Sequence, residues 1–472
     1  MTERKIFSIF ATEKKTRAAL GTVVFVLLAG CSLIPAYERP AAPVPEHFDG
    51  VTEAAASPLS SWREYFPDPS LHALIEAALN HNRDLKIALA RVEEARALAG
   101  IARADRFPTL EAQASANRSR TPADLTGTGQ PHVASRYDAG LGLTAFELDF
   151  WGRVAALSES ARAQYLATDE AAKSFRIGLI SDVANTWLLL TELAEREQLA
   201  AETLKTREES LTIIRKRQEA GLATDLDVLA AEGLTESLRA QWADLKRQRV
   251  QTENALRLLT GMAVTLPAPT NLANQPSMTE LAPGLPSDVL LRRPDVRAAE
   301  QRLVAANANV GAARAAFFPR IALTASMGTA SQELSGLFDA GSKAWLFNPV
   351  LKLPLFDAGR TRANVDVAEA RKVQAVADYE KTIQQAFREV ADALAAGSTF
   401  GEQTVAQEAN LRSQQARFER VKAREQAGIA NYLEVLDASR DAFSAEQSLV
   451  SSRRQLMSAR VTLYKSLGGG EE

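Results

Sequence analysis

The fold of this chain is decided by a short glycine-centred stretch that occurs twice. Residues 219–223 read EAGLA, and residues 426–430 read QAGIA, 207 positions later. A second motif, FPTL at 107–110, returns as FPRI at 318–321. Because self-similarity at a long, fixed period is the sequence signature of a repeated architecture, we predict one structural unit written twice.

A third match shows where the two copies differ in length. FWGR at 150–153 aligns with DAGR at 357–360, again at an offset of 207, whereas the offset of the FP motif is 211. The first copy therefore holds four extra residues between the two motifs, and we expect them in the loop around residues 120–135. A join rich in proline, residues 262–287, separates the copies.

Long helices are predicted on both sides of the glycine stretches. Proline is absent from residues 132–266 and 355–472. Apolar residues there, among them Val183, Trp187 and Leu190, follow the alternating spacings of three and four that are typical of a coiled-coil seam. The two longest helices would each extend about 100 Å at the standard rise per residue. The expected helices are two long ones, 152–220 and 360–428, and four short ones, 72–106, 226–260, 294–317 and 433–467.

A strand pair is predicted in each copy, at about 108–150 and 319–357. The first strand of each pair alternates apolar with polar residues, which fits a strand that faces lipid on one side and water on the other. The return strands, about 138–149 and 344–355, alternate less regularly, and Pro349 requires an edge or a bulge there. Four strands cannot close a membrane barrel, which needs at least about eight, so the chain should oligomerise.

The expected fold class is therefore mostly α with a small β part. It combines a long coiled-coil helical barrel, four membrane strands per chain and an internal two-fold repeat. Prolines between residues 35 and 58 favour an extended strap before the first repeat. The expected boundaries are a signal peptide at 1–30, a lipidated N-terminal strap at 31–68, a first repeat at 69–261, a linker at 262–287, a second repeat at 288–467 and a tail at 468–472.

The N-terminal segment has the pattern of an export signal. Basic residues within 1–17 precede an apolar run at 18–30, which is too short to span a bilayer as a helix. Residues 28–31, LAGC, resemble the bacterial lipobox, which implies cleavage before Cys31 and acylation of that residue. In the lipoprotein pattern Ser32 points to the outer membrane. The alternative is an ordinary signal with an incidental cysteine.

Composition argues against several functional classes. The 55 Lys+Arg and 58 Asp+Glu residues give a net charge of -3, so no basic excess suggests a nucleic acid partner. Cys31 is the single cysteine, which excludes a disulfide framework and a cysteine-rich zinc site. The four histidines are scattered, and no glycine-rich phosphate loop follows a strand. We therefore expect no enzyme activity, no cofactor and no metal site.

The second copy begins with a distinctive run. Residues 290–300 read LLRRPDVRAAE and continue into AANANVG at 305–311 and FP at 318–319. This run resembles the TolC-like outer membrane efflux factor family, in its lipoprotein (NodT/OprM-type) branch. The resemblance covers essentially the whole mature chain. From the residues alone, Pro294 and Asp295 are suited to the first turn of a helix.

The resemblance implies a channel. Three identical chains would form a homotrimer with a twelve-stranded barrel in the outer membrane, continued by a helical tunnel across the periplasm. It also implies the partners of a tripartite pump, namely a periplasmic adaptor (membrane fusion) protein and an inner membrane RND pump, besides the outer membrane lipid. Such a system exports drugs or other small toxic compounds.

The resemblance places the gate at the helix tips near the glycine stretches. It implies that Leu433 lies in an apolar constriction and Asp437 in an acidic ring, and that Arg440 and Arg424 make the ionic contacts that keep the tunnel closed. Three copies of Asp437 would crowd like charge around one axis. The adaptor would grip the grooves near the tips, whose residues are Gly221, Leu222, Gly428 and Ile429.

The same residues also allow simpler structural interpretations. Asp437 and Arg440 could be a surface pair worth about 0.5 kcal/mol, since they lie three residues apart on a helix. Glu434 follows Asn431 by three residues, as Asp227 follows Thr224, which is the pattern of a capping box. At an offset of 207, the first repeat has Ala230 and Gly233 in place of Asp437 and Arg440. Only the second hairpin would then carry the ionic contacts, consistent with one mobile and one static hairpin.

Two other functional classes predict different features. A periplasmic adaptor or scaffold lipoprotein made of coiled-coil hairpins would have no pore and would not need two strand pairs. A hydrolase anchored at the surface would need a catalytic constellation that the sequence does not offer. Ion conductance in a planar bilayer separates a channel from both.

Overall fold

The computed structural model describes residues 32–48, 61–262, 271–276, 278 and 287–470. The chain divides into two compact units. The first unit holds the residues up to 40 together with 92–168 and 299–379, and the second holds 41–91, 169–298 and 380–472. Cys31 and the expected signal peptide lie outside the described residues.

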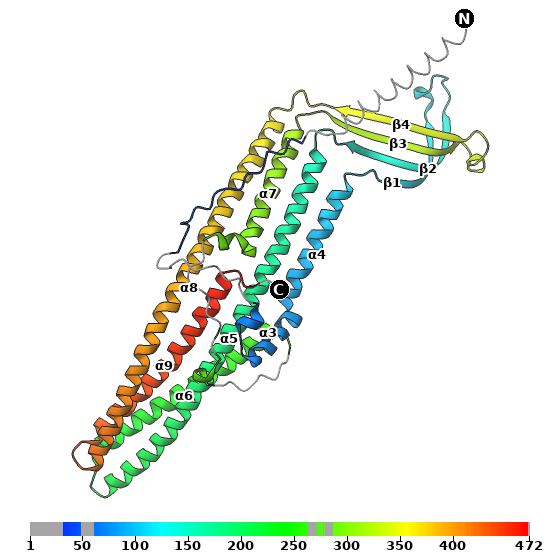
Figure 1. Cartoon of the computed structure of the whole chain (residues 1–472). Helices are drawn as coiled ribbons and strands as arrows, with labels where there is room; N and C mark the ends of the chain where they lie inside the picture. Colours follow the sequence, from blue (N-terminus) through cyan, green and yellow to red (C-terminus); the bar gives the residue numbers. More distant parts are fainter. Residues whose placement is uncertain (1–31, 49–60, 263–270, 277, 279–286, 471–472) are drawn as a thin grey trace. The chain divides into compact units, whose positions relative to one another are not determined.

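The same order of elements occurs twice along the chain (Figure 1). Each copy has a helix, two strands, a helix of 67 residues and a shorter helix. The first copy consists of α4 (Arg83–Ala104), β1 (Leu110–Thr121), β2 (His132–Leu148), α5 (Arg153–Glu219) and α6 (Asp225–Thr260). The second consists of α7 (Pro294–Ala315), β3 (Arg320–Ser331), β4 (Lys343–Lys352), α8 (Arg360–Gln426) and α9 (Tyr432–Ser466). The predicted fold class, mostly helical with four strands and a two-fold repeat, is confirmed.

One expected helix, 72–106, was wrong, because the structure has two helices there. α3 (Pro69–His81) ends at Asn82, and α4 starts directly after it. The buried Asn82 side chain accepts a hydrogen bond from the backbone N–H of Leu85 at 2.8 Å and donates one to the carbonyl of Leu259 at 2.9 Å. An asparagine that bonds the backbone three residues ahead caps a new helix, which explains the break.

The expected strap, 31–68, is not extended throughout. It contains a short helix, α2 (Trp62–Tyr65), whose Trp62 and Tyr65 are buried. The Tyr65 ring stacks on Tyr464 of α9, with ring centroids 4.5 Å apart, so this part of the strap belongs to the core of the second unit. The short 3-10 helices are η1 (Ala123–Leu125), η2 (Leu272–Asn274), η3 (Ser287–Arg292) and η4 (Leu334–Gly336).

The four strands form one antiparallel sheet in the order β1-β2-β3-β4 (Figure 1). Successive side chains of a strand point to opposite faces, so residues that pair across the strands share a face. One row consists of Ala112, Leu141, Met327 and Trp345, and the adjacent row on the other face consists of Gln113, Gly140, Gly328 and Ala344. We call these the apolar face and the polar face. Met327 and Trp345 are 72% and 79% exposed, so no described residue covers the apolar face at this row.

A β-bulge in β2 explains why the return strand looks irregular in sequence. The register shifts between Leu143 and Phe146, where β2 has one residue more than β3, and Ala145 takes a positive φ of 49°. Up to Leu143 the odd-numbered residues of β2 lie on the apolar face, and after the bulge Phe146 and Leu148 lie on it. The bulge therefore keeps the apolar face continuous although the sequence alternation changes phase.

The extra residues of the first copy were expected in the loop around 120–135, and that prediction was wrong. The connecting segments are nearly equal, 122–131 in the first hairpin and 332–342 in the second. Strand β2 has 17 residues, whereas β4 has 10. The insertion is therefore mostly in the bulged strand. Pro349 lies in β4, an edge strand of the sheet, as its missing N–H requires.

The predicted seam of the first long helix forms the core of the second unit. Val183, Trp187 and Leu190 of α5 are all at most 2% exposed. The Trp187 indole N–H donates to Asp68 at 2.9 Å, so the buried polar atom is satisfied. Further along α5, Leu204 packs with Leu238 of α6 and other apolar residues, which joins the two helices of the first hairpin.

Candidate functional site

The two helical hairpins of the second unit, α5–α6 and α8–α9, end in turns of the same construction. Gly221 and Gly428 have φ of 72° and 73°, in the left-handed region that glycine adopts most easily. Leu222 donates its N–H to the carbonyl of Arg217 at 2.7 Å, and Ile429 donates to Arg424 at 2.9 Å. This six-to-one bond defines the Schellman motif, so each long helix ends through the glycine stretch that the sequence repeats.

The start of each returning helix is capped, but not identically. In α6 the Thr224 and Asp227 side chains bond each other's backbone N–H groups, a complete capping box. Hydrogen bonds from Thr224 lower the pKa of the Asp227 carboxyl. In α9 the N–H of Glu434 donates to the Asn431 side chain at 2.9 Å. Asn431 is therefore the N-cap of α9, and Glu434 takes part through its backbone.

The proposed ionic residues of the gate lie on the surface of the second hairpin. Asp437 and Arg440 form an ion pair at 3.3 Å, with side chains 57% and 55% exposed. Arg440 also reaches Asp441 at 3.3 Å, and Asp441 binds Arg417 of α8 at 2.8 Å. Within one chain, Asp437 and Arg440 thus form an exposed pair that is continuous with a link between α8 and α9.

The other two proposed gate residues are in different surroundings. Leu433 is half-buried and packs against a small cluster formed by Leu211, Ala231 and Leu436, from α5, α6 and α9. Arg424 is exposed and makes no ion pair with any residue that the structure describes. The structure therefore brings Leu433, Asp437 and Arg440 together on the first turns of α9 and leaves Arg424 apart on the last turn of α8.

Sequence reasoning missed the contact that joins the two hairpins. Arg217 on the last turn of α5 forms an ion pair with Glu425 on the last turn of α8, at 2.6 Å. Tyr432 adds a side-chain hydrogen bond to Ser210 of α5. Burial raises the pKa of Tyr432, this hydrogen bond lowers it, and the Glu425 carboxylate raises it further. Arg217 is the equivalent of Arg424 at the offset of 207, so the repeat itself held the signal.

A buried cation lies on α5, ten residues before Arg217. Arg207 of α5 is only 9% exposed, donates to the carbonyl of Leu234 at 2.9 Å and lies over the Phe443 ring at 5.8 Å. Burial lowers the pKa of Arg207, and the positive charge of Arg440 lowers it further. Among the described residues no carboxylate pairs with it. Burying a charge without a counter-charge is costly, so Arg207 is expected to destabilise the packing of α5 against α6.

Repeat-equivalent leucines at the two tips differ in exposure. Leu222, Leu226 and Leu229 are 78%, 65% and 63% exposed and follow helical spacing. In the second repeat, the equivalent of Leu222 is Ile429, which is also exposed, whereas the equivalents of Leu226 and Leu229 are Leu433 and Leu436, which pack in the cluster described above. The first hairpin therefore presents an apolar stripe that the second does not.

Outside the tips, the distinctive run of the second copy has a structural role. Arg293 binds Asp295 at 2.7 Å and Glu389 of α8 at 2.8 Å, and it donates to the carbonyl of Ser466 at the end of α9 at 2.5 Å. Burial opposes the charge of Arg293, but its bonds to Asp295 and Glu389 outweigh this, so its pKa is raised. One side chain thus fastens the start of α7 to α8 and α9.

The strap is held on α7 in the first unit. A Cβ on Gly311 would lie 2.7 Å from the Cα of Ile34, so only glycine lets the strap pass at this distance. Asn307 donates to the carbonyl of Pro35 at 2.8 Å. Glu300 accepts bonds from Tyr37 at 3.1 Å and from Arg39 at 2.7 Å. The chain that follows Cys31 is therefore docked on the protein surface.

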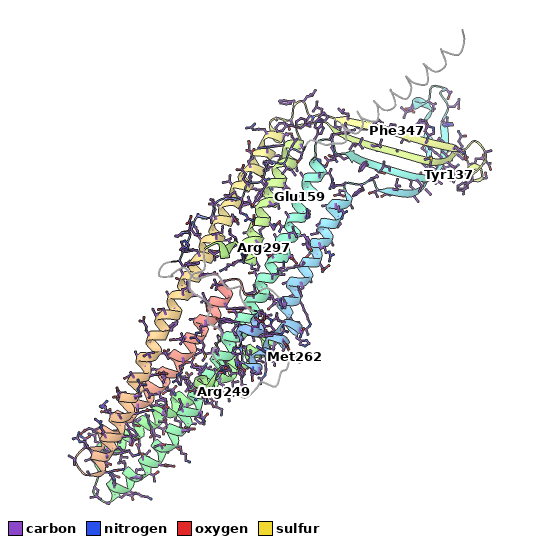
Figure 2. All side chains as sticks on the ribbon, in the orientation of Figure 1. Tyr137, Glu159, Arg249, Met262, Arg297 and Phe347 are labelled. Carbon is purple, nitrogen blue, oxygen red and sulfur yellow. The ribbon has the colours of Figure 1, made fainter. Side chains whose placement is uncertain are left out.

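The described residues hold no group of three His, Cys, Asp or Glu side chains that could bind a metal ion. Among the side chains labelled in Figure 2, Tyr137 and Phe347 belong to the sheet, and Arg249 belongs to α6 of the first hairpin.

Comparison with known proteins identifies the family. The family model described as outer membrane efflux protein matches residues 74–262 and, a second time, residues 285–469. The chain is 46% identical over 461 residues to the solvent efflux pump outer membrane protein SrpC of Pseudomonas putida, covering 96% of this chain and 98% of that protein. It is 46% identical over 453 residues to the outer membrane protein OprJ of Pseudomonas aeruginosa, covering 95% of each.

A solved structure agrees with the same assignment. The open state of the MtrE outer membrane channel of Neisseria gonorrhoeae matches with a TM-score of 0.84 and 38% identity, covering 93% of this chain and 98% of that one. The alternatives of an adaptor without a pore and of a hydrolase do not fit these relatives, which are outer membrane proteins of efflux pumps and channels. The two repeats, the four-stranded sheet and these likenesses show that the chain belongs to the outer membrane efflux protein family.

Proposed function

We propose that this outer membrane efflux channel works as a homotrimeric duct that opens and closes at the α8–α9 hairpin tips. The main support for this proposal is the sheet, which has one apolar and one polar face and two edge strands, β1 and β4. Open sheet edges do not occur in lipid, because unpaired backbone groups are too costly there. Edge strands of neighbouring copies would pair, and three chains would give twelve strands.

The gate assignment rests on how the tip residues are placed. Leu433, Asp437 and Arg440 share the first turns of α9, beside the turn at Gly428. In a trimer the three copies of Asp437 would face one axis, while Arg440 limits their repulsion through its ion pair. Arg424, exposed and without an ion pair in the single chain, is free to pair with a neighbouring copy.

The second hairpin is the mobile one in this proposal. The first hairpin is fastened near its tip by two ion pairs between α5 and α6, Arg215 with Glu232 at 2.6 Å and Arg239 with Glu208 at 2.8 Å. In the second, Arg417 with Asp441 joins α8 to α9 near the tip. Opening would part the hairpins at the pair Arg217–Glu425 and expose the cluster around Leu433.

The proposed channel also binds partner proteins and has a lipid anchor. The exposed Leu222 and Ile429 beside Gly221 and Gly428 would contact a periplasmic adaptor protein, which joins the channel to an inner membrane RND pump. The strap docked on α7 would lead to a lipidated Cys31 in the outer membrane. Because relatives are named for pumps of solvents, toluene and antibiotics, we infer small apolar or amphipathic organic compounds as the exported class.

The test is made on the purified full-length protein. We expect a mass three times that of the lipidated monomer in detergent and cation-conducting channels in planar bilayers. A monomer that conducts nothing would contradict the proposed duct. Cells that lack the protein should accumulate toluene or a hydrophobic antibiotic, and the wild-type gene should reverse this.

A further inference from the structure

The apolar face of the sheet ends in cations near the hairpin loops. On this face of β1, Ala116 is followed by Arg118 and Arg120, which pair with Ser135 and Val133 of β2. β4 begins with Lys343, two residues before Trp345 on the same face. The remainder of the face towards the strand ends that join the helices is apolar, from the row of Trp345 to the row of Leu351.

These cations are not neutralised by the protein. No Asp or Glu lies on the apolar face of the described strands, and Arg118, Arg120 and Lys343 form no ion pair with a described residue. The opposite face behaves differently: there Arg136, at the same end of the sheet, binds Asp138 through two nitrogens at 2.8 and 3.0 Å. The apolar face therefore carries three positive charges without a counter-charge among the described residues, on both edge strands and towards the hairpin loops.

These three cations lie where the boundary between the lipid headgroups and the acyl chains would be if the apolar face contacts lipid. Charged side chains on the lipid face of a membrane strand are costly in the middle of the bilayer and cost little at its edges. Arg118 and Arg120 are about 7 Å apart along β1. Lys343 of β4 lies in the row of Ala114, four residues from Arg118 along the strands and three strands away, so their Cα atoms are about 20 Å apart and the arginines and the lysine would bind separate phosphates of one lipid. Tyr137, which Figure 2 shows towards the loop end of the sheet, lies on the same face between these strands, as aromatic residues do at membrane interfaces.

We propose that Arg118, Arg120 and Lys343 form a binding site for the phosphate groups of an anionic lipid. Guanidinium groups bind phosphate through two parallel hydrogen bonds, and an ammonium adds a point charge. The acyl chains would lie on the exposed apolar row beside the site, which includes Met327 and Trp345. This rests on the proposed function, because a sheet that stands in the outer membrane with its helices in the periplasm directs these loops to the outer leaflet.

Native mass spectrometry of the full-length protein tests the site. Wild type is incubated with lipid A that carries two phosphates, with lipid A that carries one, and with inorganic phosphate. We expect the first to be retained best, and the variant Arg118→Gln, Arg120→Gln, Lys343→Gln to retain about tenfold less of it. Arg136→Gln is the matched control, since it removes a cation from the same end of the sheet on the opposite face, and it should retain as much as wild type.

The site would be overturned by equal retention in the triple variant, by equal loss in Arg136→Gln, by no dependence on lipid phosphates, or by displacement of the lipid by inorganic phosphate at equal concentration. Dissociation of the triple variant into monomers would assign the cations to contacts between copies and also overturn it. The proposed function is tested separately. The triple variant should conduct like wild type, and a wild type that conducts nothing would defeat the channel whatever the lipid result.

Discussion

Arg217 and Glu425 form an ion pair at 2.6 Å that connects the last turn of α5 to the last turn of α8. It directly joins the tips of the two hairpins, whereas Asp437 and Arg440 pair within α9. The side chains of Arg217 and Glu425 are 45% and 16% exposed, so the pair is partly shielded from solvent. If the second hairpin moves, this contact has to break.

Replacing Glu425 by Gln should therefore favour the open tip. A partly shielded pair contributes about 1 kcal/mol, which corresponds to a roughly fivefold shift of a two-state equilibrium. We expect a higher open probability in planar bilayers and greater antibiotic sensitivity. Arg215→Gln is the control, because its pair with Glu232 joins α5 to α6 inside one hairpin. Equal effects of the two substitutions would show that Glu425 has no special role in closure.

Arg293 and Arg207 are both buried, but they should respond differently to replacement by Met. Arg293→Met leaves Asp295, Glu389 and the Ser466 carbonyl without their donor and should destabilise the protein by about 2 kcal/mol. Arg207→Met removes a buried cation that no described carboxylate balances and should be neutral or stabilising by about 1 kcal/mol. Thermal unfolding in detergent measures both. A loss for Arg207→Met as large as that for Arg293→Met would refute the distinction.

Glu446 on α9 gives a prediction about pH. Burial raises the pKa of its carboxyl, and the carboxylates of Glu202 and Glu195 raise it further. A folded pKa above the unfolded one stabilises the protein below the unfolded pKa, and this contribution is lost as pH rises through the folded pKa. Glu446→Gln should thus unfold a few degrees higher than wild type at about pH 8 and at the same temperature at about pH 4. A gain that is independent of pH would point to another cause.

The anchor is tested by mass. Wild-type protein that is cleaved before Cys31 and acylated should be heavier than its mature polypeptide by the mass of the lipid groups. The lipid groups should also bind the protein to membranes when its strands are unfolded. Cys31→Ala should lose that added mass. If the two mature proteins differ only by the substitution itself, Cys31 is not lipidated and the strap on α7 has another purpose.

Much of the architecture could be predicted from the sequence, because it is encoded in periodic patterns. The glycine stretches, the absence of proline and the alternating residues of β1 and β3 predicted two repeats of long helices and strands. Two predictions failed because of local features. The bond of Asn82 to Leu85 starts a second helix, and the insertion lies mostly in the longer strand β2, whose bulge at Ala145 accounts for one of the extra residues. Neither feature can be identified from the periodic spacing of apolar residues from which the helices and strands were predicted.

The site was less predictable for a related reason. The resemblance supplied Leu433, Asp437 and Arg440. The repeat marked Arg217 as the equivalent of Arg424, but its partner Glu425 lies 208 positions away and no pattern in the sequence identifies that pairing. The buried Arg207 also has an ordinary helical context in sequence, and its burial follows from how α5 meets α6 and Phe443 of α9. Contacts between distant helices arise from packing, which requires coordinates.

The central claim, that the duct is closed at the tips of α8 and α9, is tested most directly by single-channel recording of Asp437→Ala, Arg440→Ala in planar bilayers. Asp244→Ala, Arg247→Ala, which removes an exposed Asp–Arg pair at the same spacing within α6 of the first hairpin, is the control. We expect a conductance clearly above wild type for the α9 variant, leaky cells, and little change in the control. Wild-type conductance and wild-type leakiness in the α9 variant would contradict it.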